Sequence, residues 1–449
     1  MTHRSRSLLA AVIVLVAVPS AAAQVRRPNI VLILGDDLGY GETGFQGNKE
    51  IPTPNLDSIA RGGIRFTDGY VSAPLCSPTR AGLMTGRYQT RYGHENNGQA
   101  PLLGLPLAEK TMADRLKALG YATAIVGKWH LGSELAFRPM KRGFDEFYGT
   151  LANTPYLRPR LFVDSLKSAD VAEVTSEGFY TTDAYADRAL DWIERNRDKP
   201  FFLYLPFNAV HGPLEATPRY LERFPHIPEG DRRTYAAMTS ALDDAVGRVL
   251  RKLRDIGQED NTLVIFLGDN GGPTPQTTSK NDPLRGIKST MLEGGIREPF
   301  AIQWKTHLPA GKTYRFPIIQ LDLLPTAIAA VGGRIDPAWK LDGVNLLPYL
   351  TGEKTGRPHE TLYWRMGEQW AVRHGDWKLV VSTPDGKTPR LFDLAHDIGE
   401  AKDLASERPE KQRELRALWD KWNAEQVAPL WPGPDEDKPK QRRPRPDVN

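Results

Sequence analysis

Short apolar runs alternate with stretches of helical apolar spacing through the first three quarters of the chain. The apolar runs predict buried strands at 29–34, 64–70, 122–126, 201–205 and 262–267. The stretches between them predict a helix that starts at Thr53-Pro54 and stops at Gly62-Gly63, and further helices at 111–119, 182–196 and 234–256. This alternation is typical of an α/β fold, in which helices sandwich a mostly parallel sheet.

The pattern changes after residue 350. Short strand candidates at hairpin spacing occupy 361–366, 369–373, 377–381 and 390–392, and a helix is predicted at 409–426. We therefore expect a main α/β unit at 24–350 and a smaller unit at 351–428, built from an antiparallel sheet and one helix. Residues 429–449 are rich in proline and charge, which predicts a disordered tail.

The first 23 residues have the layout of a secretory signal peptide. Arg4 and Arg6 precede the apolar run 8–18, and Ala21-Ala22-Ala23 offers a cleavage site. An uncleaved anchor is the alternative, but the run is too short to span a bilayer comfortably. The sequence thus predicts export to the periplasm or the exterior, with no membrane span after cleavage.

The composition excludes several classes of protein. The 449 residues are 40% apolar and 25% charged, with a net charge of +4, which is ordinary for a globular protein and too mild to indicate a nucleic-acid partner. The single cysteine, Cys76, excludes an intrachain disulfide and an all-cysteine zinc site. A lone thiol in an exported protein is a liability, so its presence needs an explanation.

Polar residues follow the predicted strands at their carboxyl ends, where open parallel sheets place their sites. Asp36 and Asp37 follow the first strand, and Asp269 and Asn270 follow the last. These oxygen donors favour Ca²⁺, with Mg²⁺ less favoured, over zinc. Both aspartates reach one ion only if the chain bends after Gly35. Each segment alone is more often a turn than a metal site, and it is their combination that favours a metal site.

Three further segments contain candidate catalytic residues. Lys128 and His130 are two residues apart after another strand, and His211 follows a fourth; each alone is more often a surface residue. Cys76 lies near a helix N-terminus, because Pro78 suits the first turn, and Arg80 lies one turn further on. The residues alone admit either a thiolate nucleophile or a buried structural cysteine at position 76.

The segments together resemble the type I sulfatases. Cys76-Ser77-Pro78-Thr79-Arg80 matches the Cys-x-Pro-x-Arg signature, and the segment 127–132 (GKWHLG) matches the second signature of that family. Five more segments resemble segments of that family: 28–37, 268–271, 285–288, 294–299 and 391–394. The likeness therefore runs in order from about residue 28 to 425. The two signatures in this order are highly specific.

The resemblance implies an alkaline-phosphatase-like fold and hydrolysis of sulfate esters. A maturation enzyme would convert Cys76 to formylglycine, which would explain the lone cysteine. One hydroxyl of the aldehyde hydrate would attack sulfur, and deprotonation of the other would then expel sulfate.

The resemblance also implies a role for each site residue. Calcium would be held by Asp36, Asp37, Asp269 and Asn270. Lys128 and Lys288 would hold sulfate oxygens, and Arg80 would hydrogen-bond to the residue-76 hydrate. His130 would act as the base and His211 as the acid for the leaving oxygen, a role that Lys288 could share.

One family feature is missing, and the substrate is open. Many relatives carry a serine after the equivalent of 143–145, where this chain has Thr150, Asn153 and Thr154. Polar and aromatic residues that suit a sugar at the pocket mouth are Tyr92, His94, Glu95, Asn96, Trp129, Tyr156 and Arg158. Together with export they favour a sulfated oligosaccharide over a small aryl sulfate. The alternatives are a phosphoester or phosphonate hydrolase on the same scaffold and a non-catalytic binder of sulfated glycans, which the filled catalytic positions disfavour.

Overall fold

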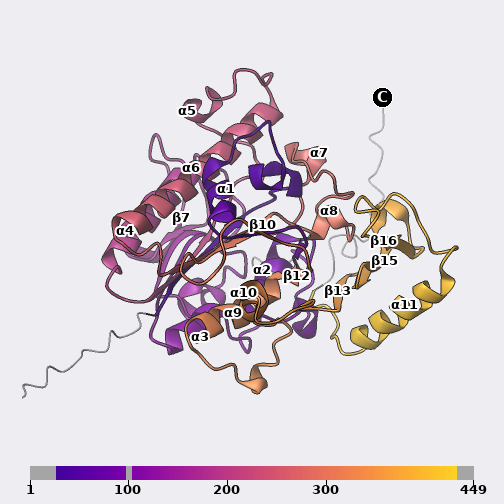
Figure 1. Cartoon of the computed structure of the whole chain (residues 1–449). Helices are drawn as coiled ribbons and strands as arrows, with labels where there is room; N and C mark the ends of the chain where they lie inside the picture. Colours follow the sequence, from indigo (N-terminus) through magenta and orange to yellow (C-terminus); the bar gives the residue numbers. More distant parts are fainter. Residues whose placement is uncertain (1–26, 98–103, 432–449) are drawn as a thin grey trace, which may run out of the picture.

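A ten-stranded sheet forms the centre of the protein, whose computed structural model describes residues 27–97 and 104–431 (Figure 1). The strand order is β11-β2-β10-β9-β1-β8-β4-β5-β6-β7. The strands are β1 (Asn29–Gly35), β2 (Ile64–Phe66), β4 (Ala122–Lys128), β5 (Glu146–Thr150), β6 (Phe162–Asp164), β7 (Ser168–Ala172), β8 (Phe201–Pro206), β9 (Thr262–Gly268), β10 (Phe300–Gln303) and β11 (Lys312–Tyr314). The predicted signal peptide at 1–23 lies outside the described residues.

The middle of the sheet is parallel and its flanks are mixed. Strands β9, β1, β8, β4 and β5 pair in parallel, so their carboxyl ends share one edge. Strand β10 runs antiparallel to both β9 and β2, and β6 and β7 add antiparallel partners beyond β5. The predicted α/β fold with a mostly parallel sheet is confirmed.

Helices cover both faces of the sheet, as the alternation along β1 requires. Val31 and Ile33 pack on one side with α1 (Pro54–Arg61), α4 (Thr181–Arg195), α5 (Pro218–Leu221) and α6 (Asp231–Asp255). Ile30 and Leu32 pack on the other side with α2 (Cys76–Thr85), α3 (Met112–Ala118), α9 (Leu323–Ala330) and α10 (Leu347–Thr351). The predicted helices are all present to within a few residues.

The strand predicted at 64–70 is two strands in two sheets. Only β2 joins the large sheet, whereas β3 (Gly69–Tyr70) pairs with β12 (Ile318–Ile319). Asp68 stands between them and forms ion pairs with Arg297 at 3.1 Å and Arg373 at 2.7 Å. The prediction of a single strand was therefore wrong. Asp68 pairs with two arginines distant in sequence, and the apolar pattern of 64–70 does not reveal them.

The C-terminal unit is the predicted small antiparallel sheet with one helix, seen at the right of Figure 1. It comprises β13 (Thr361–Met366), β14 (Gln369–His374), β15 (Trp377–Val381), β16 (Arg390–Asp393) and α11 (Pro409–Asn423). Its apolar face packs with Tyr70, Met291 and Ile296 of the main unit. Met291 lies just before α8 (Glu293–Ile296), and Ile296 is its last residue. This sheet therefore supports the segment that follows Lys288.

A buried ionic cluster joins the two units. The ammonium of Lys378 lies 2.8 Å from Glu293 and 2.9 Å from Glu400, and all three side chains are inaccessible to solvent. Burial raises the pKa of Glu400 from its ordinary value to about 7. Although burial opposes it, Lys378 and Arg297 lower the pKa of Glu293 to about 2. Two carboxylates share one ammonium here, and Glu400 is the one that resists ionisation.

This cluster predicts a pH-dependent loss of stability. Glu400 has a folded-state pKa above its unfolded value, so the unfolded chain loses this proton first as pH rises. The free energy of unfolding should therefore fall between about pH 4.5 and 7. The contribution of Glu293 is complete above about pH 4.5 and does not change in this window. Glu400→Gln should make this fall shallower, measured by urea unfolding across the window; the raised pKa values of Asp243 and Asp269 account for the part that remains. The exposed carboxylate variant Glu407→Gln should keep the wild-type slope, and an unchanged slope in Glu400→Gln would refute the assignment.

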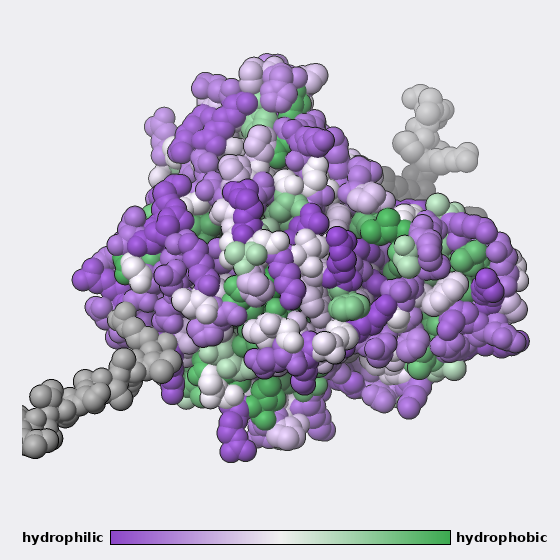
Figure 2. All heavy atoms as spheres, viewed as in Figure 1, coloured by the Kyte–Doolittle hydropathy of each residue, from purple (hydrophilic) through white to green (hydrophobic). Residues whose placement is uncertain are grey.

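Residues 430 and 431, which were predicted to belong to a disordered tail, pack against the main unit. The amide of Leu430 donates to Gly93 O at 2.8 Å, and the indole of Trp431 is buried against the ring of His94. The prediction was wrong for residues 430 and 431, because Trp431 packs on the ring of His94 and its indole donates to Asn96 O; residues 432–449 lie outside the described residues. Within 27–97 and 104–431 no helix is long and apolar enough to cross a membrane. Figure 2 shows a mostly hydrophilic face with small separate hydrophobic groups.

Candidate active site

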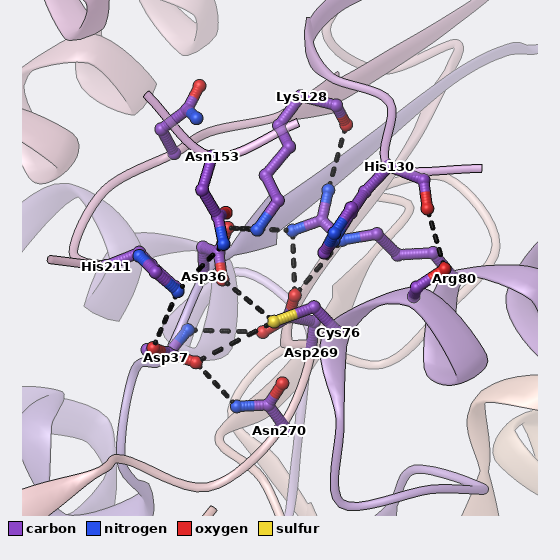
Figure 3. A network of polar contacts seen from close by, with 12 residues as sticks. Asp36, Asp37, Cys76, Arg80, Lys128, His130, Asn153, His211, Asp269 and Asn270 are labelled. Atoms are coloured by element: carbon purple, nitrogen blue, oxygen red, sulfur yellow. Dashed lines mark hydrogen bonds and ion pairs between the residues drawn. The ribbon is translucent and has the colours of Figure 1, made fainter. Parts of the chain in front are cut away.

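Cys76 occupies the centre of a polar cluster at the carboxyl edge of the sheet (Figure 3). It is the first residue of α2 and is inaccessible to solvent. Its Sγ lies 3.5 Å from Asp36 Oδ1, 3.9 Å from Asp37 Oδ1 and 3.3 Å from the ammonium of Lys288. Side chains from two segments distant in the sequence, 36–37 and 288, thus contact this one sulfur atom.

The chain bends after Gly35, as predicted, and the bend that brings both aspartates into the cluster lies at Asp36 and Asp37. Asp37 has a φ of 58°, in the left-handed region that aspartate tolerates better than most residues. Its amide donates to Asp269 Oδ1 at 3.1 Å, and the Val210 amide donates to Asp36 O at 2.7 Å. These bonds hold the turn in place of the glycine freedom that the sequence suggested.

Asp269 and Asn270 follow β9 and complete the acidic group. The guanidinium of Arg80 lies within 2.7 Å of Asp269 Oδ2 and 3.3 Å of Asp36 Oδ2, and it donates to Lys128 O at 2.9 Å. Arg80 therefore orients the carboxylates, and its bond to a residue-76 hydrate, which the resemblance implies, stays a prediction. The Asn270 amide donates to Asp37 Oδ1 at 2.7 Å.

The cations balance the carboxylates. Lys128, fully buried at the end of β4, pairs with Asp36, and the ammonium of Lys288 lies 2.6 Å from Asp37 Oδ1. Although burial opposes it, Lys128 and Arg80 keep the pKa of Asp36 below its usual range, while burial raises the pKa of Asp269 to about 6. Each of the three carboxylates contacts at least one of the three cations.

The two histidines differ in their surroundings. Burial, aided by Lys128 and Arg80, lowers the pKa of His130 well below its usual value, so its ring is neutral and able to accept a proton. His211 is partly exposed; its Nδ1 lies 2.5 Å from Gly212 O, which can only accept, so Nδ1 carries the hydrogen. Its Nε2 then accepts from Asn153 Nδ2 at 3.2 Å, with Asp37 Oδ2 at 3.4 Å. His211 can therefore donate a proton only after binding one at Nε2.

A buried hydrogen-bonded pair supports His130. His130 has a φ of 59°, and its carbonyl oxygen accepts from Ser77 Oγ at 2.7 Å. Because the serine hydroxyl has one hydrogen, His94 Nε2 must donate to Ser77 Oγ at 2.7 Å. Burial lowers the pKa of His94 to about 3, which is consistent with this neutral ring. His94 was predicted at the pocket mouth, and no sequence pattern distinguishes that position from this buried one.

Comparison with known proteins gives the same family as the motifs. A family model described as Sulfatase matches residues 28–333. The chain belongs to the sulfatase family, whose members are sulfuric ester hydrolases. The human N-acetylgalactosamine-6-sulfatase is 32% identical, over 89% of this chain and 85% of that one. Human arylsulfatase A is 34% identical, over 90% and 89%. The crystal structure of Ps i-CgsB in complex with k-i-k-neocarrahexaose superposes with a TM-score of 0.83 at 34% identity, covering 90% of this chain and 95% of that one.

Most of the residues expected at the mouth of this sulfatase are structural. Tyr92, His94, Trp129 and Tyr156 are buried; Trp129 Nε1 donates to Phe137 O, and Glu95 pairs with Arg365 of the C-terminal sheet. Asn96 Nδ2 donates to Trp431 O. Arg158 alone among them is exposed. Their aromatic or polar character alone did not show which of these residues pack inside the protein and which could contact a substrate.

Tyr156 instead holds the segment that carries His211. Its hydroxyl lies 2.5 Å from Asn208 O and 2.8 Å from His211 O. Asn153, three residues earlier, reaches His211 Nε2 from the same loop. In the region where the sequence lacked the expected serine, this sulfatase thus places an asparagine against the catalytic candidate His211.

The oxygen donors of this sulfatase fit a hard cation. Asn270 Oδ1 is buried and has no hydrogen-bond partner among the described residues. Ligand atoms of Asp36, Asp37, Cys76 and His211 lie within 4.8 Å of one another, and Asp269 joins this group through the Asp37 amide. An orphaned amide oxygen beside three carboxylates is the donor set that Ca²⁺ prefers.

Proposed function

We propose that this sulfatase hydrolyses sulfate monoesters of carbohydrates, with position 76 converted from cysteine to formylglycine and a calcium ion beside it. The observation that carries the proposal is the position of Cys76 Sγ, within 3.9 Å of two carboxylates and 3.3 Å from the ammonium of Lys288. An oxygen nucleophile at this position would have both a cation site and a positively charged cradle within reach.

The unmodified thiol is a poor candidate for the nucleophile. Burial raises the pKa of Cys76 to about 12, although Lys128 and Lys288 act in the opposite direction. A thiol in this state is protonated at neutral pH and does not attack an ester. The structural-cysteine alternative is disfavoured as well, because the contacts around Sγ are charged rather than apolar. Conversion to formylglycine by a maturation enzyme accounts for both facts.

Calcium would be held by Asp36, Asp37, Asp269 and Asn270. When bound, it would act as a Lewis acid that neutralises charge on a sulfate oxygen. With the thiol replaced by an aldehyde, oxygen atoms dominate the donor set, which favours calcium over zinc. The charges of the three carboxylates and three cations nearly cancel, so a divalent cation would make the cluster positive and suited to an anionic ester.

The remaining residues divide the work of hydrolysis. Lys128 and Lys288 bind sulfate oxygens as point charges. Neutral His130 takes a proton from the residue-76 hydroxyl, since its lowered pKa keeps a lone pair free. His211, once it binds a proton at Nε2, donates it to the departing alcohol, and the bond from its Nδ1 to Gly212 O orients the ring. Arg80 keeps Asp36 and Asp269 in place.

The relatives and the N-terminus suggest where and on what the enzyme acts. One relative is named for a sulfated amino sugar, and one solved neighbour was crystallised with a carrahexaose. We therefore assign a sulfated oligosaccharide as the substrate class, met outside the cytoplasm after export. Residues 1–23 would be removed on export, so the mature protein should begin at Gln24, which N-terminal sequencing checks.

A substrate panel together with mass spectrometry tests the proposed function. The enzyme, expressed with a maturation system, should release sulfate from sulfated oligosaccharides faster than phosphate from matched phosphate esters. The peptide containing residue 76 should be lighter by roughly 18 Da than the cysteine form. Faster phosphate release would favour the phosphoester alternative, and an unchanged thiol in an active enzyme would refute the formylglycine assignment.

A further inference from the structure

The peptide that follows Lys288 is held in an uncommon conformation. Ser289 has a φ of 70°, in the left-handed region that a serine rarely adopts without support. Lys288, the residue before it, reaches both Asp37 Oδ1 at 2.6 Å and Cys76 Sγ at 3.3 Å. The direction of this turn therefore decides where the lysine side chain starts.

Two hydrogen bonds from different units support the turn. On one side, the Ser289 amide donates to Pro74 O at 2.9 Å, two residues before Cys76. On the other, Gln369 Nε2 donates to Ser289 O at 3.0 Å from the first residue of β14. Ser289 thus lies between the helix start that carries position 76 and the C-terminal sheet.

The orientation of the Gln369 amide is fixed by its neighbours. The backbone amide of Thr383 can only donate, and it lies 2.9 Å from Gln369 Oε1, so Nε2 must face Ser289 O. Ser382 Oγ donates to the same Oε1 at 3.0 Å and accepts from the Met291 amide at 3.0 Å. Gln369 and Ser382 therefore hold the chain on both sides of Thr290.

We propose that Gln369 is a positioning residue for Lys288, through which the C-terminal sheet completes the active site. The inference rests on the proposed role of Lys288 in binding the sulfate group. Without the bond to Ser289 O, the left-handed turn loses its support on the C-terminal side, and the ammonium is no longer held at one position. Charge stabilisation depends steeply on such placement.

Gln369→Met tests the proposal, since methionine keeps the length of the side chain but cannot donate or accept. We expect kcat/KM for the best sulfate ester to fall about tenfold, equivalent to about 1.4 kcal/mol. Gln369→Glu keeps the acceptor for Thr383 and loses the donor to Ser289, so it should show a similar loss. The matched control Glu368→Gln changes the neighbouring exposed residue, whose partner is Lys387, and should retain wild-type kcat/KM.

A double-mutant cycle separates positioning from general stability. In a Lys288→Ala background, Gln369→Met should cause little further loss, because the group it positions is gone. Wild-type kcat/KM in Gln369→Met, or an equal tenfold loss in the Lys288→Ala background, would overturn the proposal. If the wild-type enzyme itself released no sulfate, the proposed function would fail instead. The thermal midpoint and the mass of the residue-76 peptide in each variant show whether folding and maturation are intact.

Discussion

Cys76→Ala should abolish sulfate release, with kcat/KM at least about 10³-fold below the wild type. The substitution removes the only group at the centre of the cluster that can become a nucleophile, and leaves Asp36, Lys128 and Lys288 in place. Alanine suits the first turn of α2, and it is smaller than the buried cysteine it replaces, so the fold should persist. Initial rates on a sulfated oligosaccharide, read as free sulfate, measure the effect.

Met84→Leu provides the control for this variant. Met84 is buried in the same helix but belongs to the apolar core, and a volume-conserving change there costs less than about 1.5 kcal/mol. It should retain wild-type kcat/KM. Turnover in Cys76→Ala within tenfold of the wild type would rule out position 76 as the source of the nucleophile, whatever its chemical form.

The fold and the location of the site could be predicted because both depend on local pattern. Apolar runs that end in Asp36 and Asp269 mark parallel strands, and parallel strands bring their carboxyl ends to one edge. The same reasoning brought Lys128 to that edge. The pattern was therefore sufficient to bring Asp36 and Asp269 together, 233 residues apart in the chain, whereas Lys288 was expected only from the family resemblance.

The details that the pattern missed depend on contacts distant in sequence. The bend at Asp37 is held by Asp269 and Val210, and the turn at Ser289 by Pro74 and Gln369. The antiparallel strand β7 is exposed along its length and has no apolar alternation to reveal it. Such features carry no periodic signal, because a tertiary partner rather than the local chain determines them.

Asp37→Asn should lower kcat/KM by at least about 10²-fold at low calcium concentration, and added calcium should restore part of the loss. Asp37 contacts Lys288, Asn270 and His211, and asparagine keeps its shape while removing one of three negative charges from the cation site. Loss of one carboxylate weakens calcium binding, so the concentration that gives half-maximal activity should rise at least about tenfold.

Calcium titration of chelator-treated enzyme decides this prediction. Wild-type activity should fall on removal of calcium and return on its addition, with magnesium a weaker substitute because it requires stricter octahedral geometry. Asp191→Asn, a change of an exposed carboxylate on α4 that pairs with Arg195, should titrate as the wild type does. An Asp37→Asn enzyme with wild-type calcium dependence would show that Asp37 does not hold the ion, and would move the cation site toward Asp269 and Asn270, where the orphaned Asn270 oxygen would remain the ligand to test next.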